Sequence, residues 1–198
     1  MQEQTWWNQH AENKIEEFNE WVGDDTAESK VYMANYLNGK DYQSIFDAGC
    51  ATATFYNTLK KNGNSLHYTG IDSCKFFVMF NKNRGVSMIE SDIRNIPVSD
   101  NAVDICFSRH TFEHQSNFKD IMSELLRVSK KEMTHIFFIK PSAIENISYS
   151  QHENLYHNCY SKDSIEQFLI EHPKVASWNW VDINDTECAL HVYMAKSL

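Results

Sequence analysis

The sequence is poor in the residues that several common architectures need. Its 198 residues include 6 glycines, 3 prolines and 5 cysteines. The cysteine count is odd and no two cysteines stand in a C-x-x-C spacing, which argues against a disulfide framework and against a structural zinc site. We expect no metal in this protein. The five positions are Cys50, Cys74, Cys106, Cys159 and Cys188.

Long apolar runs are also missing. None approaches the ~20 residues that a membrane-spanning helix requires. The opening stretch, MQEQTWWNQHAENK, lacks the basic and apolar regions of a signal peptide. Reduced cysteines fit a reducing compartment. We therefore expect a cytoplasmic protein with no membrane insertion.

Positive charge is scarce, since 18 Lys and Arg face 27 Asp and Glu, for a formal net charge of −9. Proteins that bind nucleic acid usually carry a basic face, so nucleic acid is not the partner we expect. What the sequence does contain is a hydrophobic content of 42% with 13% aromatic residues, which is typical of a globular chain. The length is sufficient for one sizeable core.

Strand-like and helix-like segments alternate along most of the chain. This alternation predicts an α/β fold, with a doubly wound, mostly parallel sheet and helices on both faces. Residues 1–40 are predicted to form an N-terminal helical extension that packs on a core domain, 41–198. Strands are predicted at 44–48, 66–72, 86–90, 102–108, 134–140, 175–183 and 187–195, and helices at 5–22, 26–37, 52–62, 73–83, 116–130 and 161–172. Ser73 and Ser161 are the predicted caps of two of these helices.

Polar residues follow the first four predicted strands. Sheets of this kind bind ligands beyond the carboxyl ends of their strands. Three neighbouring strands would each bring an aspartate to the same edge, and a carboxylate after the second strand can accept both hydroxyls of a ribose. The four strand ends read Asp47-Ala48-Gly49, Asp72-Ser73, Ser91-Asp92-Ile93 and Ser108-Arg109-His110.

The stretch SIFDAGCATATF resembles a nucleotide-binding turn with too few glycines. A G-x-G-x-x-G pattern started at Gly49 meets Ala51 and Thr54, and no P-loop is present. Asp47 would repel a phosphate but suit a ligand with a cationic end. Alanine in a left-handed conformation would cost roughly 1–2 kcal/mol. We therefore interpret the stretch as a cofactor turn whose pocket is narrowed by Ala51 and Ala53.

Taken together, residues 42–196 resemble the class I S-adenosylmethionine-dependent methyltransferases, in their small-molecule-type branch. The resemblance rests on SIFDAGCATATFYNTL, YTGIDSC, MIESDIRNIPVSDNAVDICFSRHTFEH and FKDIMSELLRVSK, in that order. It implies a seven-stranded sheet with the last strand antiparallel, S-adenosyl-L-methionine as cofactor, Asp72 as the ribose ligand and Asp92 as the acid beside the adenine. The family's lysine-proline-glycine-glycine turn is replaced here by KKEMTH, which we expect to be a connection far from the site. The implied cofactor-binding residues are Asp47, Ala48, Gly49, Cys50, Ala51, Asp72, Ser73, Ser91, Asp92, Ile93, Ser108 and Arg109.

Methyl transfer is an in-line displacement in which the protein aligns the reactants and excludes water. Some acceptors also need a base to remove a proton. The candidate catalytic residues are His110, His114, His152 and His157, although such histidines are more often structural. The nucleic-acid methyltransferase motif asparagine-proline-proline-aromatic is absent. We therefore expect transfer to oxygen or nitrogen of a small-molecule acceptor, closed over by the long segment 141–160.

Two other functions compete with this interpretation. HTFEH, residues 110–114, fits the H-x-x-E-H pattern of an inverted zinc peptidase, which needs both histidines on one helix face. The domain could also be a non-catalytic or degenerate cofactor-binding subunit. The sequence leaves the oligomeric state open.

Overall fold

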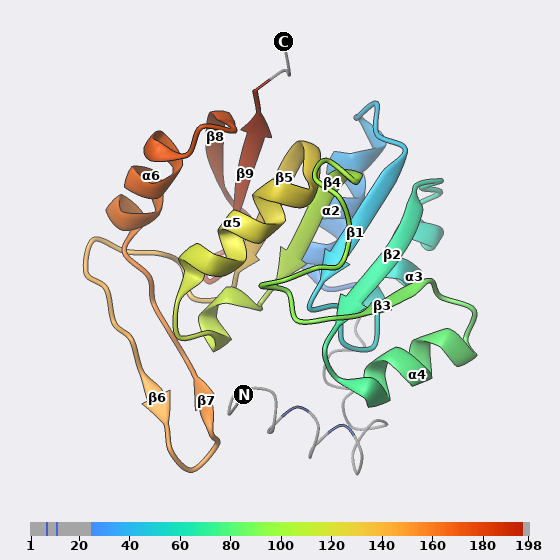
Figure 1. Cartoon of the computed structure of the whole chain (residues 1–198), viewed down its shortest axis with the longest axis horizontal. Helices are drawn as coiled ribbons and strands as arrows, with labels where there is room; N and C mark the ends of the chain where they lie inside the picture. Colours follow the sequence, from blue (N-terminus) through green and yellow to red (C-terminus); the bar gives the residue numbers. More distant parts are fainter. Residues whose placement is uncertain (1–6, 8–10, 12–24, 196–198) are drawn as a thin grey trace.

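The sheet at the centre of the molecule has seven strands with helices on both sides (Figure 1). The computed structural model describes residues 7, 11 and 25–195. The strand order is β3-β2-β1-β4-β5-β9-β8, and β9 runs antiparallel to both of its neighbours. The predicted α/β fold, with a mostly parallel seven-stranded sheet, is confirmed. The strands are β1 (Ser44–Ala48), β2 (His67–Asp72), β3 (Met88–Glu90), β4 (Val103–Arg109), β5 (Ser129–Phe137), β8 (Val175–Asp182) and β9 (Cys188–Met194).

Two hydrophobic clusters fill the two faces of this sheet. Because side chains alternate along a strand, Ile45 packs in the cluster under α2 and α3, while Phe46 contacts the cluster under α5 and α6. The turn η1 (Phe112–His114) follows β4 directly. The helices are α2 (Glu28–Asn38), α3 (Thr54–Lys61), α4 (Lys75–Asn83), α5 (Phe118–Val128) and α6 (Lys162–Glu171).

The helix starts follow from local hydrogen bonding. Ser161 accepts the backbone N–H of Ser164, as predicted for the start of α6. The prediction for α4 is wrong by one residue, because Cys74 rather than Ser73 is its N-cap and no side chain caps the helix there. Instead the N–H of Cys74 is bound by the carboxylate of Asp72 at 2.9 Å. The end of β2 thereby supplies an acceptor for the N–H of the N-cap residue itself.

The predicted bounds of the fifth strand are also wrong. β5 begins at Ser129, directly after α5, so KKEMTH lies within the strand instead of forming a connection. Its polar side chains are buried because other elements satisfy them. Glu132 and Thr134 are fully buried, and Tyr36 and Tyr42 donate to the Glu132 carboxylate. A buried strand with polar, partnered side chains shows no apolar run in the sequence.

The segment after β5 is ordered by a small hairpin, β6 (Tyr149–Ser150) and β7 (Leu155–Tyr156), which stands apart from the main sheet (Figure 1). A bridge between Asn146 and Cys159 closes its base. Of the helix predicted at 5–22, Trp7 and Ala11 are helical and the rest lies outside the described residues. The division at residue 40 stays a prediction. No helix within the described ranges is both long and apolar enough to cross a membrane.

Candidate cofactor and acceptor site

The ends of β1, β2 and β4 meet at one edge of the sheet. Ala48 lies opposite Ile71 on one side and opposite Ser108 on the other. The predicted turns after these strands are therefore neighbours in space. At this edge Thr111 crosses Gly49, since a Cβ added to Gly49 would lie 2.7 Å from the Thr111 hydroxyl.

The turn after β1 answers the question of its missing glycines. Gly49, Ala51 and Ala53 have φ values of 75°, 46° and 52°, so all three are left-handed. Both alanines thus occupy the conformation for which glycine is usual, at a cost of about 1–2 kcal/mol each. Helix α4 stabilises this turn, because Asn81 donates to the carbonyl of Ala51 at 2.7 Å and Arg84 to that of Thr52 at 3.2 Å.

Asp72 connects the end of β2 to this turn. One carboxylate oxygen accepts the N–H of Ala51 and the other accepts the N–H of Cys74, both at 2.9 Å. Burial raises the pKa of Asp72 to about 6, against the lowering effect of these N–H groups. Each carboxylate oxygen has more than one lone pair, so Asp72 can accept further hydrogen bonds from a ligand.

Asp47 lies on the side of the sheet covered by α2 and α3. The residue is 4% exposed, and its carboxylate accepts a hydrogen bond from the Tyr68 hydroxyl at 2.6 Å. Burial raises its pKa to about 6, whereas Tyr68 and then the nearby Lys30 and Arg109 lower it. Asp47 thus belongs to a buried polar group beneath the turn.

The third aspartate is bound by its own loop. The Asp92 carboxylate accepts hydrogen bonds from Nε and Nη2 of Arg94, at 3.0 and 2.7 Å. Burial raises the pKa of Asp92, but the bonds from Arg94 outweigh burial, so the pKa is lowered overall. The Ser91 hydroxyl donates to the carbonyl of Asn95 at 2.9 Å, and Ile93 is buried. The loop therefore presents an ion pair beside the end of β3.

A histidine–glutamate pair follows β4. His110 has a φ of 55°, and its Nε2 lies 2.6 Å from Glu187, which comes just before β9. Burial lowers the pKa of His110, so the ring is neutral near pH 7. Burial would raise the pKa of Glu187, but the bonds from His110, Ser29 and Asn184 outweigh it and bring that pKa to about 2. Since Glu187 is ionised, Nε2 carries the proton and Nδ1 is the nitrogen that can accept one.

Arg109 stands beside this pair. Its Nε donates to the Ser29 hydroxyl at 2.9 Å and its Nη2 lies 3.5 Å from Glu187. Ser29 in turn donates to Glu187 at 2.7 Å. Burial lowers the Arg109 pKa, with Glu187 opposing, but an arginine stays charged at neutral pH. One guanidinium and one carboxylate thus meet at the start of α2.

Ser108 points into the core instead of toward the strand ends. Its hydroxyl lies 2.7 Å from His135 Nδ1, and His135 Nε2 lies 3.3 Å from Glu113. All three side chains are fully buried. Glu113 also accepts the backbone N–H groups of Phe138 and Ile139, at 2.6 and 3.4 Å. This network fixes η1 against the segment that follows β5.

The other candidate histidines have different surroundings. His114 Nδ1 is 2.8 Å from the carbonyl of Tyr156, and its ring lies 5.7 Å from that of Trp7. His157 lies 3.1 Å from Glu153, and the exposed His152 belongs to the turn between β6 and β7. Their catalytic role stays a prediction.

The zinc-peptidase pattern of HTFEH does not have the geometry that it needs. His110 precedes the three-residue turn η1 and faces Glu187, whereas His114 faces the carbonyl of Tyr156. The two histidines therefore do not share a helix face. Over the part of the chain that the structure describes, no three His, Cys, Asp or Glu side chains are grouped to hold a metal ion.

Sequence reasoning missed several residues of this edge. Glu187 is 77 positions from His110, and no local pattern marks it. Asn81 and Arg84 look like ordinary surface residues of an amphipathic helix. Glu113 was visible in HTFEH, but only as part of a metal pattern. Long-range pairing brings these residues together, and a single sequence does not display it.

Comparison with known proteins points to methyltransferases. A family model described as "Methyltransferase domain" matches residues 46–137. The malonyl-[acyl-carrier protein] O-methyltransferase of Buchnera aphidicola subsp. Baizongia pistaciae (strain Bp) is 28% identical over 145 residues, which are 64% of this chain and 58% of that protein. The chain thus spans less than two thirds of the length of the curated relatives it matches.

Solved structures share the whole fold. The 1,6-didemethyltoxoflavin-N1-methyltransferase of Burkholderia thailandensis, with bound 1,6-didemethyltoxoflavin and S-adenosylhomocysteine, has a TM-score of 0.69 at 10% identity and covers 97% of this chain and 88% of that one. The magnesium protoporphyrin IX methyltransferase of Synechocystis PCC 6803, with bound SAM, has a TM-score of 0.65 at 11% identity, covering 98% and 97%.

The strand order, the turn after β1 and these matches define the class of protein. Residues 46–137 match the methyltransferase domain, and the chain has the fold of the class I S-adenosylmethionine-dependent methyltransferases. The predicted family, enzyme class and cofactor are confirmed. The residues that bind the cofactor and the acceptor remain to be proposed.

Proposed function

We propose that this protein transfers the methyl group of S-adenosylmethionine to a hydroxyl oxygen or a ring nitrogen of a small molecule, with His110 as the general base. The observation that carries the proposal is the pair formed by His110 and Glu187, 2.6 Å apart, at the end of β4. A positive φ at a residue that is not glycine is strained, and such strain concentrates at functional sites.

The cofactor lies, in this proposal, along the turn after β1. Asp72 accepts the ribose hydroxyls, because its carboxylate is already oriented by the N–H groups of Ala51 and Cys74. Asp92 and Ile93 flank the adenine. Gly49 lets the backbone approach the sulfonium end, and the negative charges of Asp47 and Asp72 favour that cation. S-adenosylmethionine supplies the methyl group as an electrophile on a good leaving group.

His110 then serves the acceptor. The acceptor oxygen or nitrogen attacks the methyl carbon while the sulfur–carbon bond breaks, and the acceptor proton passes to His110 Nδ1. Glu187 orients the ring and stabilises the imidazolium that forms, as a carboxylate does for other catalytic histidines. Burial keeps His110 neutral before the reaction.

A second acceptor class is favoured by the curated relatives. Their name describes methylation of malonyl groups carried on acyl-carrier protein. A carboxylate needs no base, but it would be bound by Arg109, which lies beside His110 at the same edge. The two acceptor classes therefore differ in their dependence on His110.

The test is a panel of small hydroxyl, ring N–H and carboxylate acceptors, with formation of S-adenosylhomocysteine as the readout. We expect turnover of a hydroxyl or N–H acceptor to fall about 10²–10⁴-fold in His110→Gln, the usual contribution of a general base. Cofactor affinity should stay within twofold in that variant. A carboxylate as the only acceptor, methylated equally well by His110→Gln, would overturn the base assignment.

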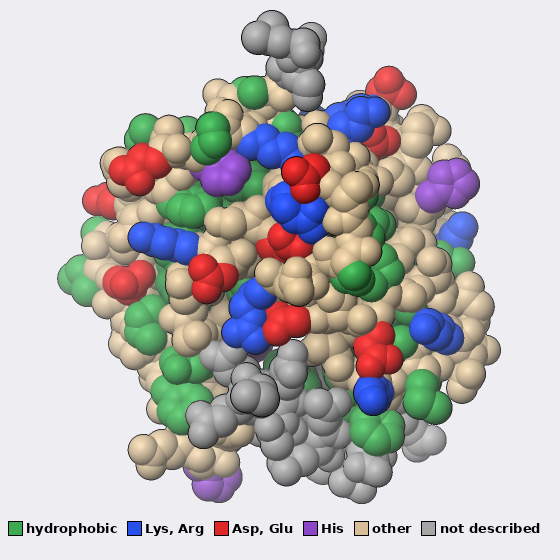
Figure 2. Space-filling view, viewed as in Figure 1, with side chains coloured by type: hydrophobic (Ala, Val, Ile, Leu, Met, Phe, Trp, Pro, Cys, Tyr) green, Lys and Arg blue, Asp and Glu red, His purple; other side chains and the backbone are tan. Residues whose placement is uncertain are grey.

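We also propose that the acceptor is not a nucleic acid and that the protein acts in the cytoplasm. Figure 2 shows Asp, Glu, Lys and Arg side chains interspersed over the face that it draws, without a broad basic patch among the described residues. This distribution and the net charge of −9 favour a small acceptor over nucleic acid. A cytoplasmic location follows from the cysteine usage noted above.

A further inference from the structure

We propose that two copies of this chain pair through strand β8 and so form a symmetric dimer with one continuous sheet. The inference goes beyond the methyl-transfer activity and does not depend on it. β8 is the last strand in the sheet order, and among the described residues no strand pairs with its outer side. The opposite edge, β3, is only 3 residues long and offers little to a partner.

The backbone of β8 presents a regular row of groups outward. Ile183 donates its N–H to the carbonyl of Glu187 at 3.0 Å, so these two residues form a hydrogen-bonded pair of the ladder between β8 and β9. The same register pairs Val181 with Ala189 and Asn179 with His191. Because bonded and non-bonded pairs alternate, Trp178 and Trp180 direct their N–H and C=O groups away from β9.

Most of β8 lacks the features that usually keep an exposed edge strand from pairing with a strand of another molecule. Residues 175–181, VASWNWV, include no charged residue and no proline. A register shift lies between Val175 and Ser177, at the beginning of the strand, and leaves the remainder regular. Natural edge strands commonly carry lysine, proline, an inward charge or a twist along their length. β8 has the features of a strand that pairs with another.

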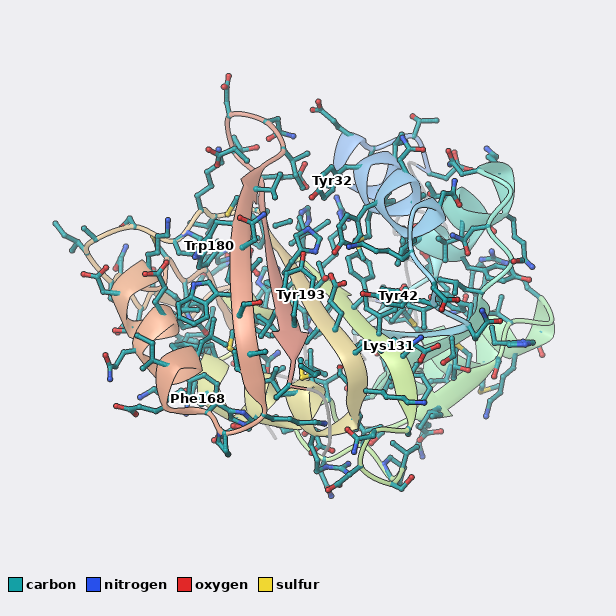
Figure 3. The ribbon with its side chains drawn as sticks, turned by 90° about the horizontal axis from the view of Figure 1, so that it is seen from above. Tyr32, Tyr42, Lys131, Phe168, Trp180 and Tyr193 are labelled. Atoms are coloured by element: carbon teal, nitrogen blue, oxygen red, sulfur yellow. The ribbon has the colours of Figure 1, made fainter. Side chains whose placement is uncertain are left out.

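The two sides of β8 are suited to a second copy of the same strand. Trp178 and Trp180 are half-buried at the rim of the cluster under α6, and Figure 3 shows Trp180 on the α6 side. Ser177 and Asn179 are exposed on the other side, toward α2, where Figure 3 labels Tyr32 and Tyr193. Paired strands would place Trp178 against Trp180 of the second copy and Asn179 against its own equivalent.

Symmetry favours a second copy as the occupant, and the absence of charge on residues 175–181 permits it. Each chain carries a net charge of −9, which opposes self-association, so two copies can meet closely only through an uncharged surface such as residues 175–181. An antiparallel pair about a twofold axis is self-complementary. If residues 177–181 overlap, Trp178 bonds with Trp180 of the second copy, and Asn179 lies beside its own equivalent at the axis. The sheet would then run through 14 strands, twice the 7 of one copy.

Asn179 provides a sharp test. Sedimentation velocity at micromolar concentration should give a dimer for the wild-type chain and a monomer for Asn179→Lys and for Asn179→Asp, because equal charges would meet at the axis. An equimolar mixture of the two variants should recover the dimer mass as a heterodimer. Ser99→Lys, on an exposed loop far along the chain, is the matched control and should stay dimeric. Because Asn179 is exposed, both variants should keep the folded secondary structure of Ser99→Lys, with thermal midpoints that are lower only by the stabilisation that association gives the dimer.

Hydrogen exchange supplies a second readout. The Trp178 and Trp180 amides should be protected in the wild-type dimer and exchange at least tenfold faster in Asn179→Lys. The Val181 amide, which faces β9, should be protected in both. A wild-type monomer at every concentration, or a dimer that survives both substitutions with freely exchanging Trp178 and Trp180 amides, would overturn the proposal.

Discussion

Two alanines hold a conformation that glycine would adopt at lower energy. The missing glycines were evident from the sequence, and so was the strain that alanine would carry if the turn were left-handed. The sign of φ was not evident, because it depends on contacts from Asn81 and Arg84 to the carbonyls of the turn. The residue types therefore showed that the conformation of this turn was unusual, but the left-handed φ of its alanines depends on tertiary hydrogen bonds that the sequence does not display.

Ala51→Gly should stabilise the protein. Relief of the left-handed alanine gains about 1–2 kcal/mol, and the added freedom of glycine in the unfolded chain takes back about 0.5–1 kcal/mol. We expect a net gain of about 0.5–1 kcal/mol in the free energy of unfolding, measured in urea, with cofactor affinity equal or better. Ala143→Gly, at a residue outside the helices whose φ is not positive, is the control and should not stabilise. Much weaker cofactor binding by Ala51→Gly would mean that the alanine methyl contacts the ligand.

Because of Glu187, the free energy of unfolding should decrease at acidic pH. Its pKa is depressed to about 2 in the folded protein, so its contribution is present above about pH 4.5, the unfolded value, and is lost as the pH falls toward 2. After allowance for solvent screening, this contribution is about 1–2 kcal/mol. Glu187→Gln should therefore lower the unfolding free energy at pH 7 and show a flatter dependence between pH 5 and pH 3. An unchanged pH dependence would contradict the assigned pairing with His110.

At the scale of elements, the alternation of strand-like and helix-like segments predicted the sheet and its helices, but it did not locate strands with polar side chains correctly. β5 carries Glu132 and Thr134 into the interior, where tyrosines and His191 satisfy them, so periodicity placed the strand five residues late. The hairpin of β6 and β7 lies within what the sequence suggested only as a long connection. Its attachment to η1 depends on Glu113, whose backbone carbonyl accepts the N–H of Asn158 at 2.9 Å.

Glu113→Gln should loosen the segment from residue 138 to residue 160. The substitution removes the charge that holds the N–H of Phe138 and the ring of His135, and charge-assisted bonds are worth about 1.5–3 kcal/mol each. We expect a loss of about 2–3 kcal/mol in unfolding free energy and faster proteolysis within this segment. His152→Ala, in the exposed turn of the same hairpin, is the control for proteolysis. Proteolysis that is unchanged in Glu113→Gln would show that the Glu113 carboxylate does not hold this segment in place.

For the whole molecule, order along the chain was more informative than any single motif. Four strand ends with aspartates or polar residues, at the spacing of one family, predicted the class, although each motif alone was weak. The fold and the edge of the sheet proposed to bind the cofactor could be predicted from the sequence, because parallel strands bring their carboxyl ends together. The acceptor side of the site could not be predicted, since it pairs His110 with Glu187, which lies 77 positions away in the sequence.

The most direct test of the account is calorimetry of S-adenosylhomocysteine binding to the wild-type chain, to Asp72→Ala and to Asp185→Asn, a control at an acid on the loop between β8 and β9. Wild-type affinity should rise as the pH passes about 6, because Asp72 ionises there and its carboxylate accepts hydroxyl groups better than the protonated acid. Asp72→Ala should weaken binding by about 1.5–3 kcal/mol, roughly 10- to 150-fold, and should flatten this pH dependence. Wild-type affinity and pH dependence in a folded Asp72→Ala would contradict the placement of the cofactor at the ends of β1 and β2.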